Sequence, residues 1–410
     1  MRDWACSLSI LLLLVPGDAV VAGDEPTDAD RSWTRAIKDG DLSIGLHYRF
    51  ESVEDDAFFD DATASTLRTT LGYRSAAYRH FRIALEVEDV TDVGAGDLHD
   101  NQGAGSLWNG VTARPAIADP DITEMNQANL SYDGWRDTEI WLGRREIVLD
   151  DHRFVGNVGW RQNHQSFDGV VVEQGSIPRS ALTYAYLDNV NTITGANRGL
   201  AGHALSVAID AARAGTVTPY FLHLDFDSPA GSTLSTRTLG ASLAGHAAVR
   251  GWTLPYRLEL AQQDDAADNP GPVDAGYLRL EIGANDEHWS FGVGHETLEG
   301  SPGNGAFGTP LATLHKFNGW ADKFTSTPAD GLKDLYATVG YEWDRWSAVV
   351  VRHEFDADSG GASHGSEMDG QISYKSSWEQ LFAVAFAVFE ADGPAFTDTE
   401  KIWAYTSYTF

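Results

Sequence analysis

Short segments of alternating polarity fill the chain from residue 42 to its end. In the first segment, residues 42–51, apolar or aromatic side chains occupy nearly every second position, and mostly polar residues lie between them. A β-strand places successive side chains on opposite faces, so each segment predicts a strand with one apolar and one polar face. The segments are roughly 10 to 13 residues long, which is the length that tilted membrane strands need.

The final segment shows the same alternation and ends on an aromatic side chain. Ile402, Ala404, Thr406, Tyr408 and Phe410 share one face of the predicted strand. A terminal Phe in this position resembles the signal that the assembly machinery of bacterial outer-membrane barrels reads. Taken alone, the segment is equally compatible with an edge strand of a soluble β-sandwich.

The connections between the segments separate these two folds. About eighteen segments can be counted, an even number of the kind that bacterial single-chain barrels use. The connections after odd-numbered segments are long and polar, as in residues 92–122, 146–163 and 300–330, whereas those after even-numbered segments are tight. Because membrane barrels carry long loops on one rim and short periplasmic turns on the other, this sorting favours a membrane barrel over a sandwich.

The N-terminal residues predict export. The apolar run from Leu8 to Val15 is too short to cross a bilayer as a helix and has the length of a signal-peptide core. Cleavage after Ala22 would remove residues 1–22, together with Cys6, and leave a short periplasmic leader (23–41) before the barrel (42–410). The predicted fold class is therefore all-β, a transmembrane antiparallel β-barrel of about eighteen strands in the bacterial outer membrane.

The charge of the chain limits the partners that it can bind. The chain holds 60 acidic against 29 basic residues and a formal net charge of −31, so it has no basic surface for nucleic acid. Much of the acid falls in the predicted outer loops, whereas Arg residues recur on the predicted lumen faces, often two residues from a Glu. Because Arg on the lipid face near the midplane costs roughly 2–4 kcal/mol, these Arg side chains are predicted to face inward.

The densest cluster of charged and amide side chains runs from Arg144 to Asn163. A loop of this composition cannot face lipid, because its backbone and charges would be unsatisfied in hydrocarbon. Folded inward, it would narrow the pore with paired Arg and Asp groups, as charged rings do in selective channels. Alternatively, Asp150 and Asp151 only neutralise Arg145 and Arg153 and so hold the loop.

The stretch GRREIVLDDHRFVGNVGWRQNHQSFDG (Gly143 to Gly169), with TPLATLHKFNGWADKF (Thr309 to Phe324), resembles the alginate-export family of outer-membrane β-barrel proteins. The resemblance implies an eighteen-stranded, porin-like barrel with an Arg-rich lumen, and an acidic polysaccharide as one possible solute. It also implies a constriction that contains Arg145, Arg153 and Arg161 together with Asp150 and Asp151. The acidic balance of this chain departs from that of a polyanion exporter, so alginate itself is not implied.

The predicted function is passive diffusion of polar or acidic solutes, such as sugar acids, oligosaccharides or an acidic exopolysaccharide, without enzymatic activity, cofactor or metal. Other predicted partners are outer-membrane lipids, lipopolysaccharide and the assembly machinery that reads Phe410. The Arg and Glu side chains could instead only brace a wide barrel. The predicted pore-lining residues are Arg49, Arg68, Arg82, Arg145, Asp150, Asp151, Arg153, Arg161, Asn163, Arg257, Arg279 and Arg352.

Two other functions stay open. A barrel enzyme of the lipase or protease kind would need a Ser or paired acids beside a His such as His152 or His353, and no spacing in the chain forms a recognisable triad. A structural barrel could bind divalent cations or lipopolysaccharide through acidic loops such as residues 54–61. That loop lacks a fixed ligand pattern.

Overall fold

The computed structural model describes residues 32–94, 98–228 and 231–410. The predicted signal peptide, its cleavage site and Cys6 lie outside the described residues, as do residues 23–31 of the predicted leader. Among the described residues, no helix has the length and apolar character needed to cross a bilayer.

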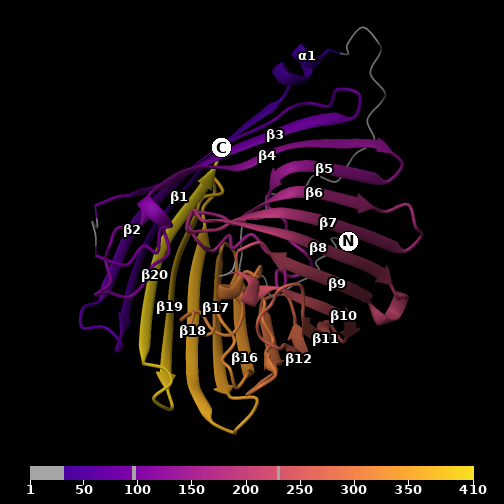
Figure 1. The fold of residues 1–410 in the computed structure, drawn as a ribbon. Helices are drawn as coiled ribbons and strands as arrows, with labels where there is room; N and C mark the ends of the chain where they lie inside the picture. Colours follow the sequence, from indigo (N-terminus) through magenta and orange to yellow (C-terminus); the bar gives the residue numbers. More distant parts are fainter. Residues whose placement is uncertain (1–31, 95–97, 229–230) are drawn as a thin grey trace.

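Eighteen antiparallel strands form one continuous wall (Figure 1). They are β1 (Asp41–Asp55), β2 (Ala62–Arg74), β3 (Phe81–Asp92), β4 (Ile122–Trp135), β5 (Thr138–Arg145), β6 (Ser166–Gln174), β7 (Ser180–Asn191), β8 (Asn197–Asp210), β9 (Thr216–Phe226), β10 (Thr236–Val249), β11 (Trp252–Asp265), β12 (Asp274–Asn285), β13 (Trp289–Leu298), β16 (Leu332–Trp343), β17 (Trp346–Asp356), β18 (Ser363–Lys375), β19 (Leu381–Ala391) and β20 (Thr399–Thr409).

The first and last wall strands close the barrel. Strand β1 pairs with β20 from Gly45 opposite Thr409 to Asp55 opposite Thr399, and the two strands lie side by side in Figure 1. Each remaining strand pairs with its neighbour in sequence, apart from the step from β13 to β16. The predicted all-β barrel of eighteen strands is confirmed.

Short elements lie outside the wall. A hairpin of two two-residue strands, β14 (Gly300–Ser301) and β15 (Gly305–Ala306), lies between β13 and β16. Within the described ranges, the helical elements are α1 (Trp33–Lys38) and the 3-10 turns η2 (Gly105–Leu107), η3 (Ala212–Ala214), η4 (Ser232–Leu234) and η5 (Leu314–Lys316). Helix α1 was not predicted within the leader. Ser32 caps it by accepting a hydrogen bond from the backbone of Arg35.

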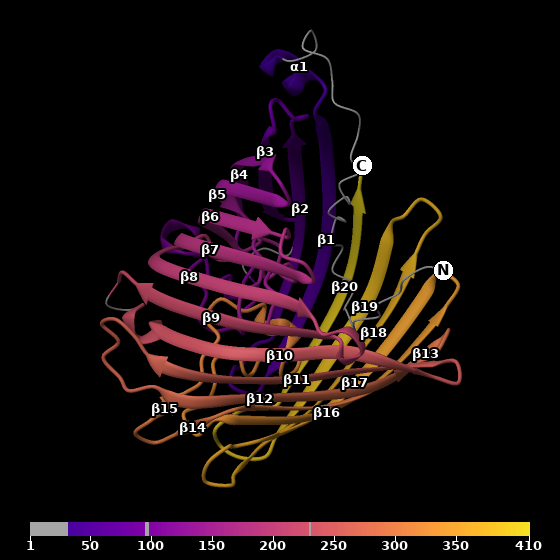
Figure 2. The same cartoon turned by 90° about the vertical axis from the view of Figure 1, so that its right-hand side faces the viewer.

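The two rims differ as the sequence predicted. Figure 2 shows the wall from the side, with α1 at the rim where β1 begins. At this rim β4 and β5 are joined by residues 136–137 alone. Three long loops leave the opposite rim and are named here L2 (93–121), L3 (146–165) and L7 (299–331). In a membrane barrel the rim with short turns faces the periplasm.

Each strand presents an apolar outer face. On β1, Leu42, Ile44 and Leu46 are exposed on the outside, whereas Arg49 and Glu51 point inward and are buried. The same alternation holds on the alanine-rich strand β19, whose even-numbered apolar side chains point outward and whose alanines point inward. The outward apolar band is the surface that hydrocarbon would cover.

The band yields a test of the membrane orientation. Replacing Leu46, at the middle of the exposed apolar run on β1, with Arg is expected to destabilise the barrel by roughly 2–4 kcal/mol, because the charge would lie near the bilayer midplane. Leu42→Arg, on the same face but at the start of the strand, should cost only about 0–1 kcal/mol. Urea unfolding in lipid vesicles measures both, and equal losses would contradict the assignment.

Candidate functional site

Loops L3 and L7 fold into the barrel and bind each other. Val155 of L3 and Leu311 of L7 form a parallel bridge, and both side chains are buried in an apolar cluster with the inner wall of β6 to β9. The backbone amide of Gly156 donates to the carbonyl of Leu311 at 2.9 Å. A side chain at Gly156 would collide with Thr313, so the two backbones approach this closely only because position 156 is glycine.

Aromatic stacking joins the same two loops a few residues further along. The Trp160 ring of L3 stacks on the His315 ring of L7, with 4.1 Å between ring centres and an angle of 7°. Both rings contact Trp403, a fully buried inward side chain of β20. The two loops are therefore fixed to each other and to the wall.

The first charged cluster lies against β1 and joins all three loops. The Arg161 guanidinium lies 3.0 Å from Glu51, 3.6 Å from Asp119 and 3.6 Å from Asp322. Arg49 donates to Asp119 at 2.7 Å. Because these side chains come from β1, L2, L3 and L7, the cluster fastens the loops to one side of the barrel.

The second charged cluster lies against β11 and β12. Asp150 of L3 lies 2.5 Å from Arg257, and Asp151 lies 2.5 Å from Arg279. Lys316 of L7 donates to the backbone carbonyl of Asp151 at 2.9 Å. Arg257 and Arg279 also pair with the Glu two residues further along their own strands, at 2.8 Å in both cases. The two aspartates of L3 thus bind wall arginines and do not neutralise Arg145 or Arg153.

Arg153 is the most enclosed cation of L3. Its side chain donates to Glu296 of β13 at 2.7 Å and to Asn318 of L7 at 3.2 Å. Its guanidinium lies 4.7 Å from the ring centre of Phe317. With 2 % of the residue exposed, Arg153 anchors the loops and has little surface left for a passing solute.

Two further predicted residues, Arg68 and Asn163, lie on the inner side near β2 and β4. Arg68 donates to the His164 ring and, at 3.3 Å, to the carbonyl of Gln162. The side-chain amide of Asn163 donates to Glu124 at 2.8 Å. Both residues therefore hold the end of L3 against the wall.

Three predicted residues lie apart from these clusters. Arg82 bonds Asp133 at 2.5 Å close to the short-turn rim. Arg145 lies 4.1 Å from the Trp141 ring centre and 4.0 Å from Glu173. Arg352 differs from its predicted inward orientation. Its neighbours Val351 and His353 are the buried inward side chains of β17, so Arg352 is on the outer face, where it pairs with Glu354 at 2.8 Å.

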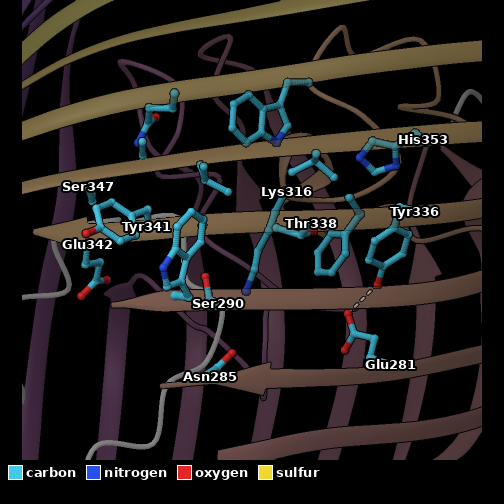
Figure 3. A pocket seen from close by; sticks show the side chains of 18 of the residues that line it. Glu281, Asn285, Ser290, Lys316, Tyr336, Thr338, Tyr341, Glu342, Ser347 and His353 are labelled. Atoms are coloured by element: carbon cyan, nitrogen blue, oxygen red, sulfur yellow. Dashed lines mark hydrogen bonds between the residues drawn. The ribbon is translucent and has the colours of Figure 1, made fainter. Parts of the chain in front are cut away.

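A cavity of about 240 Å³ lies between L7 and the inner wall of β12 to β18. Figure 3 shows Lys316 among the wall side chains that surround it, with Tyr336 donating to Glu281 at 2.5 Å. Arg279 and Phe317 also line it, with both cations within about 6 Å of the Phe317 ring centre, so cations and an aromatic ring share one space. Lys316 was not predicted as a site residue. It lies in the stretch TPLATLHKFNGWADKF and is one of only six lysines, which was a usable signal.

The loop carboxylates are held in their ionised form. Burial alone would raise the pKa of Asp119, Asp151 and Asp322, but neighbouring cations hold each pKa below its ordinary value. The main cations are Arg49 for Asp119, Arg279 for Asp151 and Lys401 for Asp322. A carboxyl whose pKa is lower in the folded state stabilises that state above its ordinary pKa and loses the contribution as the pH falls toward the lowered value. The loop attachments therefore persist at neutral and mildly acidic pH.

Comparisons with known proteins agree with this architecture. Residues 40–182, which include β1 to β6 and loops L2 and L3, match the family model described as alginate export. The resemblance to the alginate-export family is confirmed. Among curated protein sequences, the chain has no match.

Several solved structures share the fold of this chain. OpdK of Pseudomonas aeruginosa, crystallised with vanillate, has a TM-score of 0.67 at 14% identity, covering 90% of this chain and 98% of that one. OccK9 (OpdG) of the same organism has a TM-score of 0.70 at 15% identity, covering 92% and 99%. OccAB4 of Acinetobacter baumannii has a TM-score of 0.67 at 14% identity, covering 91% and 98%. The fold is that of a porin-like outer-membrane barrel.

Proposed function

We propose that this protein is a passive outer-membrane channel for small polar and acidic solutes, including sugar acids and short acidic oligosaccharides. The single observation that carries the proposal is the lumen-filling pair of loops, L3 and L7, which presents charged side chains inside a closed barrel. No covalent chemistry is part of the proposal.

The two charged clusters support a charge-selective path. Both hold Arg side chains whose partners are carboxylates, so the geometry that binds Asp and Glu also suits the carboxylate of a solute. The pore-lining residues in this proposal are those named from the sequence, without Arg352 and with Lys316 and Trp141 added. Arg153 and Asn163 serve as loop anchors within it.

The cavity beside L7 supports a carboxylate-bearing solute of modest size. Lys316 and Arg279 provide positive charge there, while the inward-facing Tyr336 provides a ring face on which a planar or sugar ring can pack. OpdK, whose fold is similar, was crystallised with vanillate, an aromatic carboxylate. The same chemical class fits the cavity of this chain.

Liposome swelling with a panel of neutral and acidic sugars tests the proposal. Lys316→Gln is expected to reduce uptake of acidic solutes about tenfold and to leave neutral sugars unchanged, because one charge-assisted hydrogen bond worth roughly 1.5 kcal/mol is lost. Lys375→Gln, which changes a partly exposed lysine at the end of β18, is the matched control. Equal uptake of acidic and neutral solutes by the unmodified channel would overturn the acidic-solute proposal.

A further inference from the structure

Three potential metal ligands meet where loop L3 leaves and rejoins the wall. His164 Nδ1 lies 2.8 Å from Glu146 Oε1 and 3.3 Å from Glu88 Oε1. The three ligand atoms all lie within 4.8 Å of one another. Ligands bound to one zinc ion at about 2.0–2.2 Å lie roughly 3 to 3.5 Å apart, so these atoms already have the spacing of a shared coordination sphere.

Glu88 gives a second, independent observation. The residue is 1 % exposed, and its Oε1 atom, which faces His164 and Glu146, has no hydrogen-bond donor. Its other oxygen accepts the backbone amide of His164 at 3.1 Å. A buried carboxylate oxygen without a donor is costly, and a bound cation would satisfy it.

Outer partners orient the carboxylate of Glu146. The side-chain amide of Asn126 donates to Oε1 at 2.7 Å, and the amide of Asn157 donates to Oε2 at 2.5 Å. Carboxylates that bind metals are commonly held by such hydrogen bonds. Asn126 also bonds Glu86 at 2.8 Å, which brings a further negative charge close to the three ligands.

We propose that Glu88, Glu146 and His164 bind one divalent transition-metal ion of the zinc type. One imidazole and two carboxylates form a three-ligand set suited to zinc, and a water molecule from the lumen would complete a tetrahedron. Calcium and magnesium prefer more oxygen ligands and no imidazole. Because Glu146 and His164 stand near opposite ends of L3, the ion would fasten both ends of the loop to β3.

Arg68 competes with the metal for His164. Its guanidinium donates to Nε2 of the ring, so in this arrangement Nε2 carries no proton and Nδ1 carries one. A metal ion at Nδ1 displaces that proton to Nε2, and Arg68 must then turn to its other partners, the Gln162 carbonyl 3.3 Å away and Glu88 Oε1 3.9 Å away. Removing Arg68 should therefore strengthen metal binding.

Isothermal titration of chelator-treated, detergent-purified barrel with zinc chloride tests the site. We expect one zinc ion per chain, with affinity reduced at least tenfold by His164→Gln or Glu88→Gln and increased by Arg68→Gln. Calcium chloride at the same concentrations should give no comparable binding. His223→Gln, an outward-facing histidine on β9, is the matched control and should bind zinc as the unmodified protein does.

Gel mobility with and without heating verifies that each variant has formed a barrel. Absence of stoichiometric zinc binding to folded, unmodified protein would overturn the proposal, and so would zinc binding that His164→Gln and Glu88→Gln both leave intact. Binding is measured without solute flux, so this result is separate from the outcome of the uptake experiment.

Discussion

Arg161→Ala is expected to shift the channel toward cations and to raise its conductance. Arg161 is one of three cations, with Arg49 and Lys401, that face the carboxylates of Glu51, Asp119 and Asp322. Removing it leaves three negative charges against two positive ones. Breaking a buried ion pair in this way costs roughly 3–5 kcal/mol, so the attachment of L2, L3 and L7 to β1 weakens at the same time.

Planar-bilayer recordings in a potassium chloride gradient measure both effects, through the reversal potential and the single-channel current. Arg352→Ala is the matched control, because it also removes one arginine, but Arg352 and its partner Glu354 both lie on the outer face of the barrel. That control should change neither quantity. If Arg161→Ala also leaves the reversal potential unchanged, the β1 cluster does not contribute to ion selection.

Asp151→Asn is expected to shift the ion selectivity of the channel toward anions, opposite to the effect of Arg161→Ala. Asp151 lies between Arg279 and Arg257, at 2.5 Å and 3.8 Å, and Asn keeps its size while removing the charge. The two guanidinium groups then have a free face for a solute carboxylate. We expect a reversal potential shifted toward anions and a stronger block of current by added sugar acid.

The same recordings provide the check for Asp151→Asn. The control is Asp56→Asn, which removes one exposed carboxylate from the outer loop between β1 and β2. A shift of equal size in both variants would mean that overall charge, and not the position between Arg257 and Arg279, sets selectivity.

The barrel fold could be predicted from the sequence because lipid imposes the same simple pattern on each strand. A strand that touches hydrocarbon on one side and water on the other must alternate, and segments such as Leu42 to Glu51 do so visibly. The lengths of the connecting loops predicted, independently of the alternation, that one rim carries long loops and the other carries short turns. Neither signal depends on which residues meet across the lumen.

The partners inside the lumen could not be predicted in this way. Arg161 meets Asp119 and Asp322, which lie 42 and 161 positions away in sequence, and only the folded loops bring them together. The pairing of Asp150 and Asp151 with the arginines of β11 and β12 was not predicted for the same reason. Long-range side-chain pairing has no local periodicity, so a single sequence does not reveal it.

Arg352 shows where alternation itself fails. The segment around it, Val349 to Val351, is apolar at three successive positions, so polarity does not distinguish the inner from the outer side. The inner side of β17 carries Val351 and Phe355 because these pack into the apolar cluster that also contains Phe324 of L7. A lumen filled by apolar loop residues thus inverts the usual pattern locally.

The bridge between Val155 and Leu311 couples two loops that are far apart along the chain. Each loop is also held to the wall by its own ion pairs, Asp151 with Arg279 for L3 and Asp322 with Lys401 for L7, so a displacement of one loop strains the attachments of the other. The two loops are therefore expected to move as one unit, so that the width of the path beside L3 also depends on the position of L7.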